Sequence, residues 1–229
     1  ASAWRERGVS SVGGKAIKRV AKRLEPVGGR KGGMLGGKAL GALELRSGLV
    51  VAMATHADGE TNEAKLVPAL LPQVRAQVAG RRWVADRQFC DLTQPAAFAQ
   101  AGDQCLVRYH PKTPFFADAG HPAQRGQDAQ GRVWEQAWGW LGSEKSKPRR
   151  FLRRLTLYRP GEETILLLTD LLAATRYPAA YLLDLYLARW SIERVFQQIT
   201  EVFHLQTLIG TTPQGTVFQF AFCVLLYNL

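Results

Sequence analysis

The sequence has little cysteine and little histidine. Its three cysteines, Cys90, Cys105 and Cys223, include no C-x-x-C pair. The odd count and the spacing exclude a disulfide framework and a cysteine-based zinc site, and they favour a reducing compartment with buried or idle thiols. The four histidines are scattered and show no metal-ligand spacing: His56, His110, His121 and His204.

The sequence also lacks a long apolar run. None approaches the ~18 residues that a transmembrane helix needs, and no signal peptide is visible. The nearest case is FQFAFCVLLYNL, residues 218–229, which Gln219 interrupts. The chain begins without Met and stops inside this apolar pattern, so we expect both ends to be truncated. No membrane partner is expected.

Acidic residues are scarce relative to basic ones. Of the 229 residues, 30 are Lys or Arg and 19 are Asp or Glu, which gives a net charge of +11 and a pI near 10.0. This balance favours a polyanionic partner, and nucleic acid is the commonest one. The alternatives are a basic enzyme with small anionic substrates and a ribosome-like structural role. Because 46% of the residues are hydrophobic and 21% charged, the composition indicates a globular protein of one or two domains.

Strand and helix patterns alternate on both sides of an irregular interval at about 111–150. Strand patterns precede and follow this interval, and helix patterns end the chain. The pattern predicts an α/β core interrupted by an insertion. The predicted strands are 38–46, 49–55, a short one ending at Asp86, 104–110, 150–159 and 163–169; the predicted helices are 62–78, 92–101, 178–205 and a final apolar one.

The stretch DLYLARWSIERVFQQIT, residues 184–200, places Tyr186, Arg189 and Glu193 at spacings of three and four. On one continuous helix these side chains fall within about 60° of one another. An apolar stripe runs just beside them, made of Leu185, Ile192, Phe196, Ile199 and Phe203. Arg189 and Glu193 are also i, i+4 neighbours, so the alternative interpretation is a surface salt bridge.

Asp86 follows Trp83-Val84-Ala85 at the end of an apolar strand. In α/β sheets a carboxylate at this position is presented to a crevice. The alternative is an aspartate that caps the next turn or pairs with Arg87.

Three motifs together resemble bacterial DDE transposases: WVADRQFCD, the strand ILLLTDL, and Y-x2-R-x3-E in a helix led by ARW. The most similar branch is the insertion-sequence-four group, with its Tyr-Arg-Glu-Lys signature. KALGALELRSGLVVAMATHADGETNEAKLVPALL and LQTLIGTTPQGTVFQFAFCVLLYNL extend the resemblance over nearly the whole chain.

The resemblance implies a ribonuclease-H-like α/β core interrupted by a β-rich insertion. We expect residues 1–103 to form the first part of the core. Residues 104–168 would form the insertion with the last core strand at its end. Residues 169–229 would form the helical part that carries the Tyr-Arg-Glu helix. The 193 − 86 = 107 positions between Asp86 and Glu193 agree with an inserted sub-domain.

The resemblance also implies the site. Asp86 and Glu193 would be catalytic metal ligands for two Mg²⁺ or Mn²⁺ ions, and Tyr186, Arg189 and Arg87 would contact DNA. The implied function is cleavage and strand transfer of insertion-element ends. The expected partners are the double-stranded terminal inverted repeats, target DNA and a second copy in a synaptic homodimer. The expected location is the bacterial cytoplasm, on the nucleoid.

Two positions depart from the family pattern. The signature lysine falls at Thr200, and Gly13 in VSSVGGKAIKRV occupies the place of the first aspartate. We therefore hypothesise a degenerate copy with weakened metal binding. The alternatives are a different register, or a ligand from residues outside this sequence. The rival functions are a non-catalytic DNA-binding remnant and a nuclease on the same fold.

Other residues have candidate roles as well. Asp170 is expected to be a strand-end cap. Trp134, Trp138 and Trp140 are expected to pack a β-rich sub-domain, with stacking of a flipped base as the alternative. Basic clusters at 15–31 and 145–154 suit phosphate contact, although charge runs are commonly just solvated. The residues of these clusters are Lys15, Lys18, Arg19, Lys22, Arg23, Arg30 and Lys31, and then Lys145, Lys147, Arg149, Arg150, Arg153 and Arg154.

Overall fold

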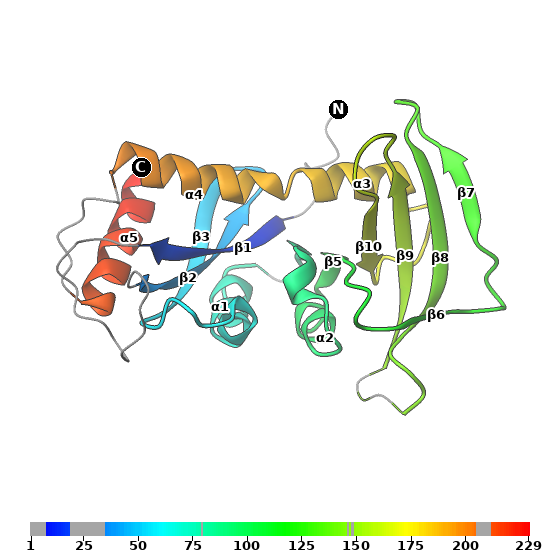
Figure 1. The fold of residues 1–229 in the computed structure, drawn as a ribbon, viewed down its shortest axis with the longest axis horizontal. Helices are drawn as coiled ribbons and strands as arrows, with labels where there is room; N and C mark the ends of the chain where they lie inside the picture. Colours follow the sequence, from blue (N-terminus) through cyan, green and yellow to red (C-terminus); the bar gives the residue numbers. More distant parts are fainter. Residues whose placement is uncertain (1–7, 19–34, 79, 146, 148, 205–211) are drawn as a thin grey trace. The chain divides into compact units, whose positions relative to one another are not determined.

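The structure is a computed structural model that describes residues 8–18, 35–78, 80–145, 147, 149–204 and 212–229. Strands and helices alternate along it (Figure 1), and the predicted mixed α/β class is confirmed.

Within this part of the chain no helix is long and apolar enough to cross a membrane. In chain order the elements are β1 (Val9–Lys18), β2 (Leu35–Glu44), β3 (Leu49–His56), η2 (Glu63–Leu66), α1 (Val67–Arg75), β4 (Arg82–Ala85), η3 (Arg87–Phe89), α2 (Gln94–Phe98), β5 (Gln104–Arg108), β6 (Phe115–Ala117), β7 (Gln124–Gln127), β8 (Val133–Leu141), β9 (Arg150–Tyr158), β10 (Ile165–Thr169), α3 (Ala179–Leu187), α4 (Trp190–Val202) and α5 (Pro213–Tyr227).

The chain forms two compact units. Unit 1 comprises Ala1–Ser10 and Val78–Arg189, and unit 2 comprises Ser11–Gln77 and Trp190–Leu229. Strand β1 therefore starts in unit 1 and continues into unit 2, while α3 and α4 belong to different units.

Unit 1 is built on a sheet with the strand order β4-β5-β10-β9-β8-β6, and β7 also pairs with β8. Strands β4 and β5 run parallel, with Ala85 opposite Val107. Strand β10 is antiparallel to β5, with Leu167 opposite Arg108. Because of these directions, the ends of β4 and β5 and the β9–β10 turn share one edge of the sheet.

Helix α3 packs on β4 and β5. The guanidinium of Arg82 donates from Nη1 to the Tyr181 hydroxyl at 2.9 Å, and it also lies 5.3 Å from the centre of the Tyr177 ring. Buried Arg153 on β9 donates from Nη1 to the carbonyl of Tyr177 at 2.6 Å. These contacts fix the segment that leads into α3.

Unit 2 contains the strand order β3-β2-β1. Strands β2 and β3 form the predicted hairpin, and its Ser47-Gly48 turn is confirmed. Gly48 adopts a φ of +74°, which glycine tolerates best, and its N–H donates to the carbonyl of Glu44. Asn62 is the predicted cap, since its side chain accepts from the N–H of Ala64, although the first turn there is η2 rather than α-helix.

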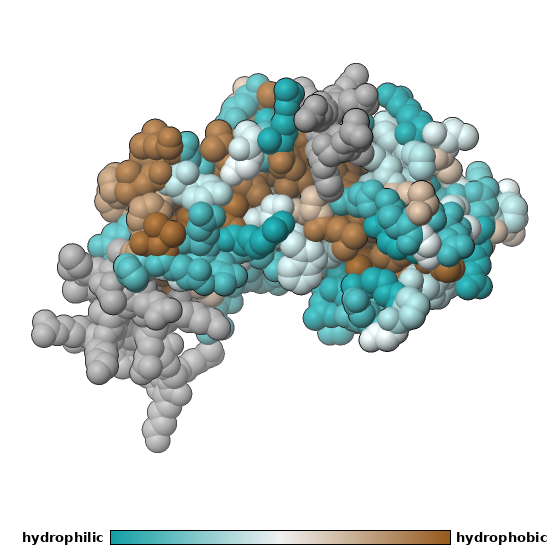
Figure 2. Space-filling view, turned by 90° about the horizontal axis from the view of Figure 1, so that it is seen from above, coloured by the Kyte–Doolittle hydropathy of each residue, from teal (hydrophilic) through white to brown (hydrophobic). Residues whose placement is uncertain are grey.

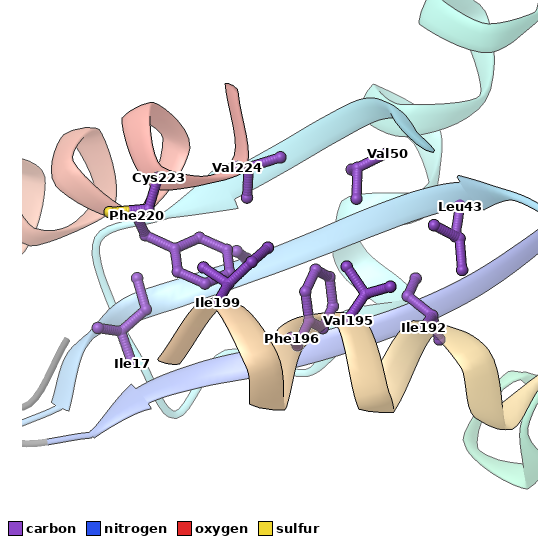
Figure 3. Close-up of a cluster of buried hydrophobic side chains, with 11 residues drawn as sticks. Ile17, Leu43, Val50, Ile192, Val195, Phe196, Ile199, Phe220, Cys223 and Val224 are labelled. Atoms are coloured by element: carbon purple, nitrogen blue, oxygen red, sulfur yellow. The ribbon is translucent and has the colours of Figure 1, made fainter. Parts of the chain in front are cut away.

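Helices α4 and α5 enclose an apolar core with strands β1, β2 and β3 (Figure 3). Two glycines allow α4 to approach the strands closely. A Cβ at Gly13 would lie 2.8 Å from Cγ2 of Ile192, and one at Gly41 would lie 2.7 Å from Cζ of Phe196. The core residues are Ile17, Ala39, Leu43, Val50, Ile192, Val195, Phe196, Ile199, Phe220, Cys223 and Val224.

The prediction of one helix over 178–205 is wrong. Helix α3 ends at Leu187 and α4 begins at Trp190. The N–H of Arg189 donates to the carbonyl of Tyr186, three residues earlier, so the chain tightens and the regular i→i−4 pattern stops. Tyr186, Arg189 and Glu193 therefore do not lie on one continuous helix, and their predicted angular separation of about 60° does not hold.

One stripe of α5 is exposed and apolar. In Figure 2 hydrophobic surface gathers at the left of the view, at the end where Figure 1 draws α5. The residues recur at spacings of three and four, so they share one side of the helix. They are Phe218, Phe222 and Leu225, exposed by 71%, 52% and 55%.

Candidate functional site

Asp86 and Tyr186 come together within unit 1. Asp86 directly follows β4, and its Oδ1 accepts a hydrogen bond of 3.3 Å from the Tyr186 hydroxyl on α3. The carboxylate makes no capping hydrogen bond to η3. Among the described residues it also forms no ion pair with Arg87. Neither alternative role of this aspartate is therefore observed.

Tyr186 is a buried phenol surrounded by charge. Only 2% of it is exposed, and burial raises its pKa to about 12. The positive charges of Arg189 and Arg108 lower this pKa and the Asp86 charge raises it, but burial dominates. The hydroxyl therefore stays protonated at neutral pH and remains a donor to Asp86.

Arg108 is a site residue that the sequence analysis missed. It ends β5, and the parallel register, continued by one residue beyond Ala85–Val107, places it opposite Asp86. Its charge acts on the Tyr186 hydroxyl. Its position at the carboxyl end of a predicted strand could have indicated a site residue. A single sequence does not show, however, that this strand pairs with β4.

The two predicted arginines differ in exposure. Arg189 is 2% exposed, its guanidinium lies 5.6 Å from the centre of the Tyr186 ring, and it hydrogen-bonds the Tyr186 hydroxyl. Arg87 in η3 is exposed. The structure thus shows Arg189 orienting Tyr186, and it shows Arg87 open to solvent beside Asp86.

Glu193 lies in unit 2, in the first turn of α4, and is exposed. It directly follows Ile192, the residue that packs over Gly13. The opposite face of β1 meets Glu63, because a Cβ at Gly14 would clash with Cδ of that glutamate. Glu63 therefore cannot stand in for an aspartate at position 13, because it lies on the face of β1 that is turned away from α4.

Thr200, at the position of the signature lysine, uses its hydroxyl within α4. Its Oγ1 donates to the carbonyl of Phe196 at 2.6 Å. This is a common back-bond of threonine inside a helix.

The two predicted metal ligands belong to different units, Asp86 to unit 1 and Glu193 to unit 2. Among the described residues no group of three His, Cys, Asp or Glu side chains that could hold a metal ion is found. Asp170 directly follows β10, and its Oδ1 accepts from the N–H of Cys105 on the neighbouring strand β5 at 2.8 Å. Its pKa is raised, chiefly by burial. Mg²⁺ needs several oxygen ligands in octahedral geometry, and within unit 1 Asp86 supplies one carboxylate.

Trp138 and, within 145–154, Arg153 are buried, so these two side chains pack the interior of unit 1 rather than forming its surface. Trp138 is buried and donates to the carbonyl of Leu172 at 3.0 Å, so it packs as expected. Trp140 is half-buried beneath Arg149, whose guanidinium lies 4.4 Å from its ring centre. Arg153 is fully buried, so the interpretation of 145–154 as a uniform phosphate surface is wrong at this residue.

Most of the basic cluster at 15–31 lies outside the described residues. Lys15, at its start, lies on β1.

Comparison with known proteins gives a match to a family model. The model described as the transposase DDE domain matches residues 19–229. A search of curated proteins found no match to the chain. The matched range starts beyond Gly13, so it does not test the position of the first aspartate.

Proposed function

Because the chain belongs to the transposase DDE domain family, we propose that it is the DNA-processing domain of an element of the insertion-sequence-four group. The proposal includes a ribonuclease-H-like core. The parallel strands β4 and β5, with Asp86 at the end of β4, support it. The partners would be element ends and target DNA in the bacterial cytoplasm.

The hydrogen bond between Tyr186 and Asp86 carries this proposal. Their pairing joins the aspartate motif to the Tyr-Arg-Glu motif across 100 positions of sequence. A strand-end carboxylate would ordinarily cap the next turn or turn toward water. Here a buried phenol orients it, and Arg189 orients the phenol.

We assign DNA backbone contact to this edge of unit 1. Arg87 is exposed there and Arg108 is partly exposed. Guanidinium groups bind phosphate oxygens in a fork geometry, and a net charge of +11 attracts DNA over longer distances. Direct phosphate contact by Arg189 stays a prediction, since that side chain is buried.

Cleavage by this copy is proposed to be weak or lost. In the family two divalent ions stabilise the attacking and leaving oxygens of the displacement. Support comes from position 13, where a glycine stands in place of a carboxylate, and from the absence of any group of three potential metal ligands among the described residues. Gly13 packs against Ile192, the residue immediately before Glu193, so a carboxylate at position 13 would lie on the face of β1 that is turned toward α4. We therefore favour a DNA-binding protein with an incomplete metal centre.

Two measurements on the unmodified chain test the proposal. Fluorescence anisotropy with a labelled duplex of mixed sequence should show binding that weakens steeply with salt. Incubation of supercoiled plasmid with Mg²⁺ or Mn²⁺ should give little nicking. Absence of DNA binding contradicts the proposed function. Nicking that disappears in Asp86→Asn contradicts only the incomplete metal centre.

A further inference from the structure

Arg108 and Glu163 form an ion pair at the edge of the sheet that carries Asp86. Nη2 of Arg108 donates to Oε2 of Glu163 at 2.8 Å. Arg108 ends β5, and Glu163 lies in the turn between β9 and β10. The antiparallel pairing of β10 with β5 brings that turn to the end of β5.

The two partners are unequally exposed. The Arg108 side chain is 18% exposed, whereas that of Glu163 is 72% exposed. The arginine is therefore held in place by the fold, and the glutamate reaches it from solvent. An exposed carboxylate returns to water at little cost.

The turn itself is held in shape by Arg159. Its Nε and Nη2 donate to the carbonyl of Glu163 at 3.2 and 2.6 Å, and its Nη1 pairs with Glu162. The backbone of Glu163 is thus fixed while its side chain remains exposed. This arrangement places an exposed acidic side chain beside a largely buried basic one.

The binding capacity of Arg108 exceeds its use. A guanidinium carries five N–H donors, and among the described residues Glu163 accepts from one nitrogen, Nη2. A phosphate group can accept two parallel bonds from the same fork, which a single carboxylate contact does not match.

We propose that Glu163 takes the place of a DNA phosphate on Arg108, and that Arg108 exchanges this carboxylate for the DNA backbone when DNA binds. The inference rests on the proposed function, because it needs DNA at this edge. Glu163 is then an internal competitor that lowers affinity for every duplex equally. Arg108 is a further phosphate contact beside Asp86 and Tyr186.

A charge-matched pair of variants tests the exchange. Glu163→Gln keeps the shape of the side chain and removes its charge. Glu144→Gln makes the same change at an exposed position of the β8–β9 loop in the same unit. Affinity for a labelled duplex of mixed sequence is measured by anisotropy over a series of salt concentrations, and thermal unfolding checks the fold of each variant.

Glu163→Gln should bind DNA about two- to five-fold more tightly than Glu144→Gln, the range expected for release of an exposed ion pair. In the Arg108→Gln background the gain from Glu163→Gln should vanish. Arg108→Gln alone should reduce the salt slope by about 0.9, the value for one lost phosphate contact on duplex DNA.

The failures of the two proposals are distinguishable. DNA binding by the unmodified chain, with equal affinities for Glu163→Gln and Glu144→Gln, overturns the exchange and leaves the proposed function standing. Absence of DNA binding by every form overturns both. The comparison of the two glutamine variants stands even if Arg108→Gln fails to fold.

Discussion

The hydroxyl of Tyr186 lies 3.3 Å from Oδ1 of Asp86 and donates to it. The bond ties helix α3 to the end of β4 within unit 1. It also makes the orientation of a strand-end carboxylate depend on a buried phenol. This role of Tyr186 can be tested without DNA, because the titration of its phenol changes the stability of the fold at high pH.

The first prediction concerns stability at high pH. The pKa of Tyr186 rises from 10.0 to about 12 because the side chain is buried. Between these values the unfolded chain loses a proton that the folded chain keeps. Stability therefore falls as pH rises through this window, by at most about 1.4 kcal/mol per pH unit. Below pH 10 the contribution is fully present.

Tyr186→Phe supplies the comparison for this prediction. The variant loses the hydrogen bond, at about 1 kcal/mol near neutral pH, and it also loses the titrating group. In urea denaturation, the stability advantage of the unmodified chain should shrink as pH rises above 10 and reverse before pH 12, because the loss over this window exceeds the contribution of the hydrogen bond. Parallel pH profiles would show that the phenol is not held protonated by the fold.

The second prediction concerns the packing of Gly13. Gly13→Ala should destabilise the protein by about 1–3 kcal/mol, because the new Cβ would lie 2.8 Å from Cγ2 of buried Ile192. Leucine has no methyl group at that branch, so Ile192→Leu should relieve part of the cost. Chemical denaturation of the four members of this double-mutant cycle gives the coupling energy. Additive effects would contradict the packing account.

The third prediction concerns Arg153, which is buried and orders the segment before α3. Its guanidinium bonds Oε1 of Gln136 and the carbonyls of Leu171 and Tyr177. Burial lowers its pKa to about 10, so it stays charged at neutral pH. Arg153→Lys has no planar fork to reach these three acceptors. It should lower the free energy of unfolding by about 1–3 kcal/mol.

A matched control for that change is Arg154→Lys on the same strand. Arg154 is partly exposed over the Phe115 ring, 4.9 Å from its centre. Arg154→Lys should lower the free energy of unfolding by well under 1 kcal/mol in the same denaturation assay. Equal losses for the two substitutions would show that the buried hydrogen bonds of Arg153 add no stability.

Much of the fold was predictable because its signals are local. The β2–β3 hairpin follows from a Ser-Gly turn between two apolar runs, and Asn62 follows from capping chemistry. The position of Asp86 at a strand end was likewise readable from the apolar run before it. These features depend on neighbouring residues.

The rest depends on tertiary contacts. The break between α3 and α4 is not marked by glycine or proline, since Ala188 and Arg189 are good helix formers, so propensity predicted a continuous helix. Arg108 gains its role from the pairing of β5 with β4. Arg153 looked like a surface charge, and only the packing of β9 shows it buried. The roles of Asp86 and Glu193 as metal ligands stay predictions.

The position of Gly13 is the central question for activity. We propose that the edge carrying Asp86, Tyr186 and Arg108 is retained, while the carboxylate at position 13 is missing. A variant that restores the aspartate at position 13 also needs a smaller contact at residue 192, because the new side chain would collide with Ile192. The suitable variant is Gly13→Asp with Ile192→Leu, and its control is Gly13→Asn with Ile192→Leu.

Nicking of supercoiled plasmid in the presence of Mn²⁺ is the most direct measurement. The unmodified chain and the asparagine control should leave the plasmid intact, whereas the aspartate variant should nick it. Adding Asp86→Asn should abolish that gain. Equal nicking by the unmodified chain and the aspartate variant, or no gain from an aspartate variant that folds and binds DNA, would contradict the account.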